Sequence, residues 1–253
     1  SRLESALAID FFSLAEIKKV TPKKECVHLH ITYNEKSYPV EAKLVVLADG
    51  GRSTICQQLG IQQFQKDYKQ HAISANVSLE KPHQNIAFER FTETGPFAML
   101  PLRKFNDQNR CSLVCVVDEK ESKEMMERVE KPLLANLQER FGNRLGKIIH
   151  VGKRYDFPLK LSIAKEQVRP GLVLLGNVAH TLHPVAGQGM NLALRDIKVL
   201  VDCLYQGIRE KLNPGDMALL QGYVDKQSFD QQKVIGFTDN LVELFSSNKA
   251  PNV

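Results

Sequence analysis

Residues 174–196 read LLGNVAHTLHPVAGQGMNLALRD, and no other stretch of the chain says as much about its fold. The pattern predicts a buried strand, a polar turn with Pro184, and a helix that begins at Gly187 and Gly189, which flank Gln188. The first backbone N–H groups of a helix have no partner inside it, and the helix dipole adds about half a positive charge there. The stretch therefore predicts a site for a phosphate or a delocalised organic anion. A strand-to-helix turn whose glycines serve only close packing is the alternative interpretation.

The bulk composition is that of an ordinary globular protein. Of the 253 residues, 43% are hydrophobic and 25% are charged, and 34 basic against 29 acidic residues give a net charge of +5. The charges are spread along the chain, so no nucleic-acid partner is expected, whereas a mildly basic surface suits an anionic membrane. No apolar run approaches the roughly 20 residues that span a bilayer. Five cysteines without framework spacing indicate a reducing, cytosolic compartment.

Two short apolar runs predict the strands of a parallel sheet. Residues 44–48 are continuously apolar and lead into Asp49 and Gly50, which predicts a strand covered on both faces. A short helix would follow, with Ser53 as its N-cap. Residues 171–175 form a second apolar run, which enters the stretch quoted above.

The middle of the chain has a different pattern. Short segments of strand length alternate with turns that contain Gly, Pro, Asn or Asp, which predicts an antiparallel sheet. These segments are residues 71–79, 85–91, 97–102 and 111–117, and a further strand is expected at 155–161. Residues 121–141 predict a charged helix, kinked or divided at Pro132. Nearer the start, residues 26–33 and 38–40 alternate in polarity and predict a hairpin.

Two long helices are expected towards the end of the chain. Beyond Gly187, apolar residues recur at helical spacing and form one stripe, which is interpreted as core. The stripe consists of Met190, Ala193, Leu194, Ile197, Leu200, Val201 and Leu204. A last helix spans about residues 216–245. The expected fold class is therefore α/β, with a parallel-sheet part interrupted by an antiparallel sheet.

Two spaced motifs resemble those of the FAD-dependent aromatic hydroxylases. Residues 176–196 resemble their second flavin-binding motif, which reads G-D-A-A-H, then proline, G-x-G-x-N and a later aspartate. Residues 47–53, LADGGRS, resemble their upstream D-G-x-x-S motif. Within this family, residues 88–101 and 144–154 look like the hydroxylases of ubiquinone biosynthesis. The resemblance extends over about residues 40–245.

The resemblance implies a monooxygenase that uses FAD and dioxygen to hydroxylate a polyprenylated phenol, through a flavin C4a-hydroperoxide. NAD(P)H or another reductant would donate the electrons. Residues 1–65 and 155–253 would form a partial three-layer α/β FAD-binding domain, and residues 66–154 an antiparallel-sheet substrate domain. A cytoplasmic enzyme is expected, held peripherally at the inner face of the membrane or in a quinone-synthesis complex.

The implied site residues come from both motifs. Backbone N–H groups from Gly187 to Met190 would face the N1 and O2 edge of the flavin, where the reduced ring carries negative charge. Pro184 would line the reacting face, and with Gly187 and Gln188 it completes the expected catalytic set. The expected FAD contacts are Asp49, Gly50, Gly176, Asn177, Pro184, Gly187, Gln188, Gly189, Met190 and Asn191.

Three departures from the family pattern shape the expectations. Asn177 stands where most members have aspartate, so a hydrogen bond to the ribityl chain would lack charge assistance. Cys56 stands where the D-G motif usually ends in arginine. No G-x-G-x-x-G strand-turn-helix is found and the chain begins without Met, so a fragment that binds FAD weakly or not at all is expected. These departures leave open a non-catalytic binding or assembly module, and a hydroxylase of small soluble aromatics is a third possibility.

Two other groups of residues admit more than one interpretation. His180 and His183 have the H-x-x-H spacing of a metal pair, but no carboxylate or cysteine stands nearby at ligand spacing. A hydrogen bond of His180 within its own turn is expected instead. A second group could either wall an aromatic pocket or form ordinary sheet core: Phe88, Phe91, Phe97 and Met99.

Overall fold

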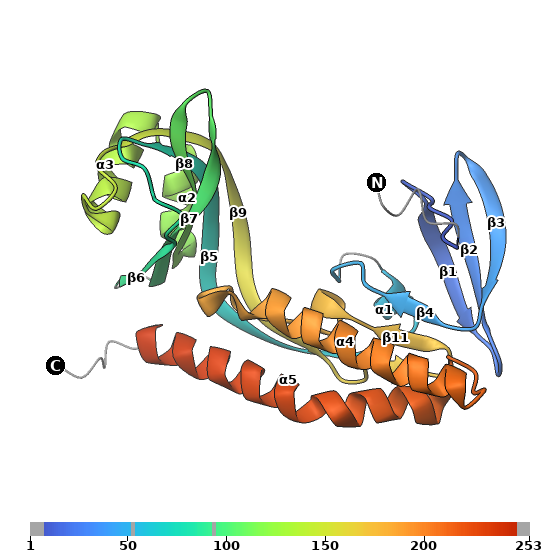
Figure 1. Ribbon diagram of the computed structural model, residues 1–253. Coiled ribbons are helices and arrows are strands. Elements are labelled where there is room, and N and C mark those ends of the chain that lie inside the picture. Colours follow the sequence, from blue (N-terminus) through green and yellow to red (C-terminus); the bar gives the residue numbers. More distant parts are fainter. Residues whose placement is uncertain (1–7, 52–53, 93–94, 247–253) are drawn as a thin grey trace. The chain divides into compact units, whose positions relative to one another are not determined.

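The computed structural model describes residues 8–51, 54–92 and 95–246 (Figure 1). The chain divides into two compact units, which are treated separately below. The first unit comprises Ser1–Phe64, Ser162–Leu182 and Gly187–Ile235. The second comprises Gln65–Leu161, His183–Ala186 and Gly236–Val253. Compactness alone does not show what each unit binds, so the expected domain boundaries stay a prediction.

The first unit contains a three-stranded antiparallel sheet in the order β1-β2-β3. Its strands are β1 (Glu16–Pro22), β2 (Val27–Tyr33) and β3 (Lys36–Ala42). A two-residue turn, Asn34-Glu35, joins β2 to β3, and both residues have positive φ, as the twist of a tight hairpin requires. The expected hairpin is confirmed.

A second small sheet holds the two apolar runs side by side. β4 (Val45–Leu47) pairs in parallel with β11 (Leu172–Leu174), and β10 (Val168–Arg169) pairs antiparallel with β11. β11 is fully buried, but Val46 of β4 is 43% exposed. The expectation that β4 is covered on both faces is therefore wrong, because the described residues bury Val45 and Leu47 but leave the opposite face of β4 partly open.

Helices α4 (Gln188–Arg209) and α5 (Met217–Ser246) follow β11 in the chain (Figure 1). Between β11 and α4 lie the short elements η1 (Gly176–Val178), β12 (His180–Thr181) and η2 (Val185–Gly187). Leu200 and Cys203 of α4 pack with Leu220 and Tyr223 of α5 against β11, which forms one core of the first unit.

The apolar stripe of α4 is core only in part: Leu200 is 4% exposed and Leu204 packs against the same core, but four other members are open. Met190, Leu194, Ile197 and Val201 are 74%, 52%, 41% and 55% exposed. The buried face instead consists of Leu192, Asp196, Leu200, Cys203 and Gly207. Helical spacing identifies an apolar stripe but not the element that packs against it. The rotation of α4 is instead set by a buried polar contact at Asp196, described below.

The short helix expected after β4 is α1 (Ile55–Gln58), and it ends before Gly60, which has a φ of +68°. The predicted N-cap, Ser53, lies outside the described residues. Thr54 occupies the N-cap position of the described helix, and its hydroxyl accepts no backbone hydrogen bond there.

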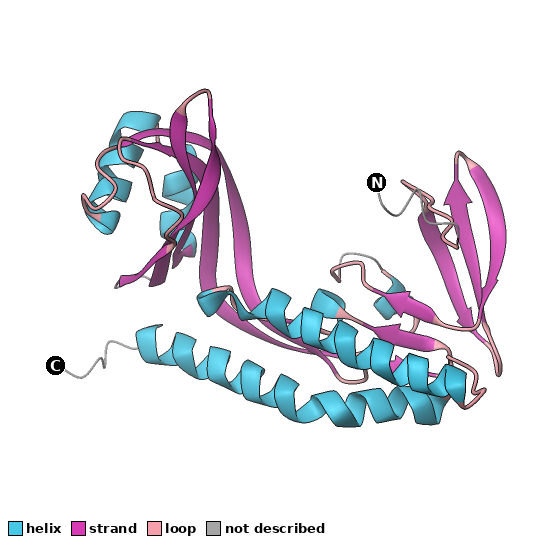
Figure 2. Ribbon diagram, viewed as in Figure 1, coloured by secondary structure: helices cyan, strands magenta, loops and turns pink. Residues whose placement is uncertain are grey.

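The predicted antiparallel sheet is confirmed as part of a six-stranded sheet in the order β12-β9-β5-β8-β7-β6. Figure 2 draws its strands in magenta. Its long strands are β5 (Gln63–Leu79), β7 (Gly95–Phe105), β8 (Gln108–Asp118) and β9 (Ile148–Ala164), with β6 (Phe88–Thr92) at one edge. Helices α2 (Glu119–Glu127) and α3 (Glu130–Phe141) pack on one face of this sheet.

The charged helix is divided, but not at Pro132. The break falls at Arg128 and Val129, whose backbones are extended, and Pro132 lies in the first turn of α3. The missing N–H of proline is tolerated in that turn, because the first N–H groups of a helix have no intrahelical partner. Asp118 caps α2 by accepting a hydrogen bond from the backbone N–H of Glu121 at 2.8 Å.

Of the two interpretations for the aromatic group in this sheet, core is correct for Phe97 and Met99. Both are 0% exposed, and Phe97 stacks on Phe141 of α3 with ring centroids 5.9 Å apart. Phe88 packs edge-on against the same ring, whereas Phe91 is 38% exposed. None of the described helices is long and apolar enough to cross a membrane.

Candidate cofactor site

The two predicted motifs meet at one edge of the small sheet of the first unit. β4 and β11 run parallel with Leu47 opposite Leu174, and the N–H of Leu175 donates to the carbonyl of Leu47 at 2.9 Å. The loops that follow the two strands are therefore neighbours. A Cβ atom on Gly51 would lie 3.6 Å from the carbonyl oxygen of Asn177. The carboxyl ends of parallel strands are where open α/β sheets bind ligands.

The loop after β4 is a tight turn held by its own aspartate. Asp49 accepts a hydrogen bond from the backbone N–H of Gly51 through Oδ1 at 2.9 Å. Gly50 and Gly51 have φ values of +73° and +74°, a conformation that residues with a Cβ rarely adopt. Asp49 thus shapes the turn, and its expected contact with FAD stays a prediction.

The loop after β11 begins with Gly176, whose φ is +69°. Its carbonyl accepts from the N–H of Ala179 at 2.9 Å, which closes the short turn η1. The carbonyl of Asn177 accepts from the hydroxyl of Thr181 at 2.8 Å, while the residue itself is exposed. The Asn177 backbone is therefore held by this bond while the residue is open to solvent, and its expected contact with FAD stays a prediction.

The start of α4 is open in the way that an anion site requires. Gly187 is the N-cap, with a φ of +59°, and it has no side chain to accept from the first N–H groups. The first turn contains no acidic residue. Among the described residues, a Cβ on Gly187 or Gly189 would meet no atom within 4 Å. Pro184, three residues earlier, is exposed and belongs to the second unit, so its place beside a flavin stays a prediction.

A buried hydrogen-bonded pair of side chains, His180 and Asp196, anchors α4 behind this opening. His180 and Asp196 are 1% and 0% exposed, and Nε2 of His180 lies 2.6 Å from Oδ2 of Asp196. Oδ1 of Asp196 accepts from the side chains of Gln227 and Gln231 of α5, at 2.5 and 3.1 Å. Burial by itself raises the pKa of Asp196, but the hydrogen bonds from His180 and the two glutamines together hold that pKa below its ordinary value.

The expectation that His180 bonds within its own turn is wrong, since its partner lies 16 residues later. The signal was present in the sequence, because the motif pairs a histidine with a later aspartate. His183 does bond within its turn: the N–H of Val185 donates to its Nδ1 at 3.1 Å. Burial lowers the pKa of His183 to about 4, so the imidazole is neutral at neutral pH. The two histidines belong to different units.

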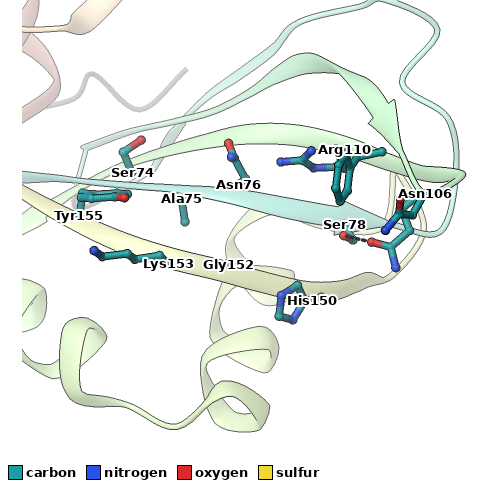
Figure 3. A pocket seen from close by; sticks show the side chains of 12 residues that line it. Ser74, Ala75, Asn76, Ser78, Asn106, Arg110, His150, Gly152, Lys153 and Tyr155 are labelled. Atoms are coloured by element: carbon teal, nitrogen blue, oxygen red, sulfur yellow. Dashed lines mark hydrogen bonds between the residues drawn. The ribbon is translucent and has the colours of Figure 1, made fainter.

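The second unit has a polar pocket of about 600 Å³ on its sheet, shown in Figure 3. It is lined from β5, β8 and β9, and the polar side chains include Ser74, Asn76, Arg110, Lys153 and Tyr155. Ser78 donates to Gln108 across one end at 2.7 Å. Sequence reasoning did not find this pocket, because its residues are far apart in the chain and carry no motif.

A family model described as an FAD binding domain matches residues 3–238. The chain belongs to this FAD-binding family. Ubiquinone hydroxylase UbiL of Rhodospirillum rubrum is 40% identical over 212 residues, which are 84% of this chain and 48% of that protein. The mitochondrial ubiquinone biosynthesis monooxygenase COQ6 of Mus musculus is 29% identical over 89% of this chain and 53% of its own length. The chain thus spans about half the length of the curated relatives it matches.

Solved structures confirm the expected fold class. The p-nitrophenol 4-monooxygenase PnpA of Pseudomonas putida superposes with a TM-score of 0.72 at 17% identity, over 93% of this chain and 58% of that one. At this identity the likeness concerns the fold alone. The open backbone at this edge fits membership of an FAD-binding family. Among the described residues, a Cβ on Gly187 or Gly189 at the start of α4, or on Gly176 in the loop after β11, would meet no atom within 4 Å.

Proposed function

We propose that the whole protein is an FAD-dependent monooxygenase that hydroxylates a polyprenylated phenol in ubiquinone biosynthesis. The observation that carries the proposal is the convergence of the loops after β4 and β11 at one sheet edge, in a chain whose relatives include ubiquinone hydroxylases. Residues 88–101 and 144–154 resemble 2-octaprenyl-6-methoxyphenol hydroxylase in particular, so we propose the reaction of that enzyme for this protein. Dioxygen would be the co-substrate and NAD(P)H the reductant.

Bound FAD would supply the redox chemistry that activates dioxygen. The residues of this chain would hold the FAD and polarise its ring. Backbone N–H groups of Gln188, Gly189 and Met190 would donate to the negative edge of the ring, and the dipole of the 22-residue helix would add to that stabilisation. Asn177 would hydrogen-bond a ribityl hydroxyl through its amide. The Asp196 contacts would keep the helix start in position.

FAD binding is tested by titrating the purified protein at its natural length with FAD and following flavin fluorescence. Gly189→Asp puts a carboxylate into the open helix start and should weaken binding by at least about tenfold, or 1.4 kcal/mol. Gly236→Asp is the matched control, because a Cβ at Gly236 in α5 also meets no atom within 4 Å. Equal affinity of both variants and the parent would contradict the proposed site.

The activity itself is tested on the protein at its natural length. A strain that lacks the protein should lose quinone, and the parent gene should restore it while the Gly189→Asp gene does not. Equal rescue by both genes would favour the non-catalytic binding or assembly module. Flotation with anionic vesicles tests the proposed peripheral membrane association.

The polar pocket favours a second candidate function, the hydroxylation of a small soluble aromatic. Arg110 and Lys153 would suit a phenol that carries a carboxylate, whereas a polyprenyl chain gains nothing from such a lining. Product analysis with a short-chain prenylphenol and with a carboxylated phenol separates the two. Turnover of the carboxylated phenol alone, lost on Arg110→Gln, would replace the first candidate by the second.

A further inference from the structure

The outer face of β2 carries side chains typical of a metal site. The sequence Cys26-Val27-His28-Leu29 alternates, and Val27 and Leu29 are buried in the core of the first unit at 0% and 9% exposure. Successive side chains of a strand point to opposite faces, so Cys26 and His28 share the outer face. Glu41 of β3 lies directly opposite His28 in the antiparallel register. Three kinds of ligand atom, sulfur, nitrogen and oxygen, are thereby placed together.

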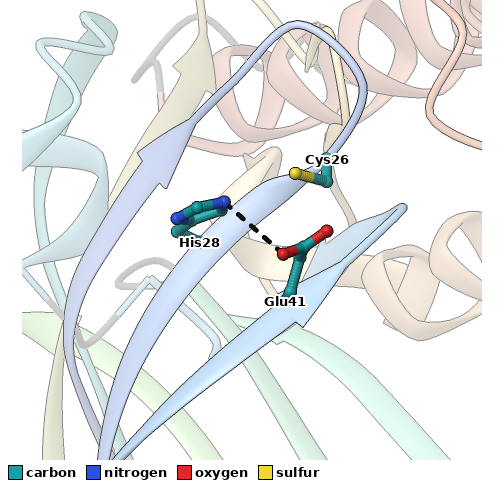
Figure 4. A group of neighbouring side chains, drawn as sticks. All are labelled: Cys26, His28 and Glu41. Carbon is teal, nitrogen blue, oxygen red and sulfur yellow. Dashed lines mark ion pairs between the residues drawn. The ribbon is translucent and has the colours of Figure 1, made fainter.

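Their spacing is close to that of a coordination shell (Figure 4). Nε2 of His28 lies 3.7 Å from Oε2 of Glu41. With the sulfur of Cys26, all three ligand atoms lie within 4.8 Å of one another. In a tetrahedral zinc site with bonds of about 2.0–2.3 Å, the ligand atoms are roughly 3–4 Å apart. The side chains of His28 and Glu41 are 48% and 70% exposed, so small rotations can bring them to that distance.

The local charge also favours a cation. The negative charges of Glu41 and Glu25 lie near the Cys26 sulfur, and the charge of Lys23 opposes them. A divalent cation between the sulfur and the carboxylate would stabilise the thiolate. The thiolate and carboxylate together would neutralise a 2+ ion.

We propose that Cys26, His28 and Glu41 bind a zinc-class divalent ion, with water as the fourth ligand. The sulfur and imidazole ligands select Zn²⁺ or Co²⁺ over Mg²⁺ and Ca²⁺, which take oxygen ligands. The ion would link the beginning of β2 to the end of β3. The three ligand residues precede the loops after β4 and β11 in the sequence, and the metal site requires no flavin.

The test uses the full chain, stripped with a chelator and titrated with Co²⁺. A thiolate ligand gives a sulfur-to-cobalt charge-transfer band in the near ultraviolet, and tetrahedral geometry gives strong visible bands. We expect both to saturate at one equivalent and to disappear when Zn²⁺ is added. Zn²⁺ should also protect Cys26 of the unaltered chain from alkylation, as read by peptide mass spectrometry.

Variants identify the ligands. Cys26→Ser should abolish the charge-transfer band, and His28→Gln or Glu41→Gln should weaken Zn²⁺ binding by at least about tenfold, since even outer-shell partners contribute that much. Cys56→Ser and His30→Gln are the controls, because Cys56 lies outside this sheet and His30 is the next outward residue of β2. Both controls should bind like the parent.

Three outcomes would overturn the proposal: no charge-transfer band at stoichiometric Co²⁺, a band that survives Cys26→Ser, or a band that is lost on Cys56→Ser. Far-ultraviolet circular dichroism of each variant checks that it has folded. The alkylation measurement needs no variant, so equal labelling of Cys26 with and without Zn²⁺ also contradicts the site.

Discussion

Asp196 is the residue whose replacement tests the structure most directly. Its two carboxylate oxygens accept from three side-chain donors, on His180, Gln227 and Gln231, and its side chain is 0% exposed. Asp196→Ala leaves these buried donors without an acceptor. A buried donor without a partner costs about 1–3 kcal/mol, and Asp196→Ala leaves three of them. We therefore expect the free energy of unfolding to fall by about 3–5 kcal/mol.

A second replacement separates charge from shape. Asp196→Asn keeps the size and one acceptor oxygen, so we expect a smaller loss of about 2 kcal/mol. The matched control is Asp202→Asn on the outer face of the same helix, where the carboxylate is 61% exposed and pairs with Lys198. An exposed pair of this kind contributes about 0.5 kcal/mol or less.

Urea unfolding at pH 7, followed by circular dichroism, measures all three variants. A loss for Asp196→Ala no larger than that for Asp202→Asn would refute the reasoning. The pH dependence is a further check: the pKa of Asp196 lies below its ordinary value in the folded state, so its stabilisation is complete above about pH 4 and is lost as the pH falls through the folded pKa. Asp196→Ala should lack this loss.

Three further predictions follow from single positions. His183 has a folded pKa of about 4 against 6.5 when unfolded, so acid favours the unfolded chain: the free energy of unfolding is unaffected by His183 above pH 6.5 and falls by about 3 kcal/mol between pH 6.5 and 4. Urea unfolding across that range should show a shallower pH dependence for His183→Gln than for the parent. Identical pH dependence of the two proteins would contradict the burial of His183. Gly215→Ala puts a Cβ 2.2 Å from the backbone oxygen of Lys43 and should lower the free energy of unfolding by about 1–3 kcal/mol in the same assay. Gly222→Ala, in open space on α5, should raise it by about 0.5–1 kcal/mol. Equal effects of the two replacements would be inconsistent with the close approach at Gly215. Asn177→Asp would restore a charge-assisted hydrogen bond to the ribityl chain and should tighten FAD binding by about 1 kcal/mol in a fluorescence titration, and unchanged affinity would remove Asn177 from the proposed site.

Local sequence predicted the elements of this protein well, because the signals are short-range. The polar residues between the predicted hairpin segments 26–33 and 38–40, the apolar runs of β4 and β11 and the glycines around Gln188 each act on the backbone within a few residues. The motif resemblance then identified the FAD-binding family from the same residues, and the family model confirms it. These features depend on the intrinsic conformational propensities of the residues and on steric limits of the local backbone. Neither changes with the elements that pack alongside.

Burial and partnership depended on elements distant in the sequence. The periodicity of α4 marks an apolar stripe, yet the buried side of the helix contains Asp196, because α5 supplies two glutamine donors and β12 supplies His180. Phe97 became core because α3 places Phe141 on it. In the same way, Cys26 and Glu41 are 15 positions apart in the chain and meet only through the pairing of β2 with β3.

The sequence by itself therefore determined the strand–turn–helix order, the open start of α4 and the FAD-binding family. The tertiary structure alone decided which face of α4 is buried, which partner His180 takes, and that the loops carrying Asp49 and Asn177 lie at one edge. The physical reason is range: backbone conformation responds to residues a few positions away, whereas desolvation and hydrogen-bond pairing are set by whichever element packs alongside.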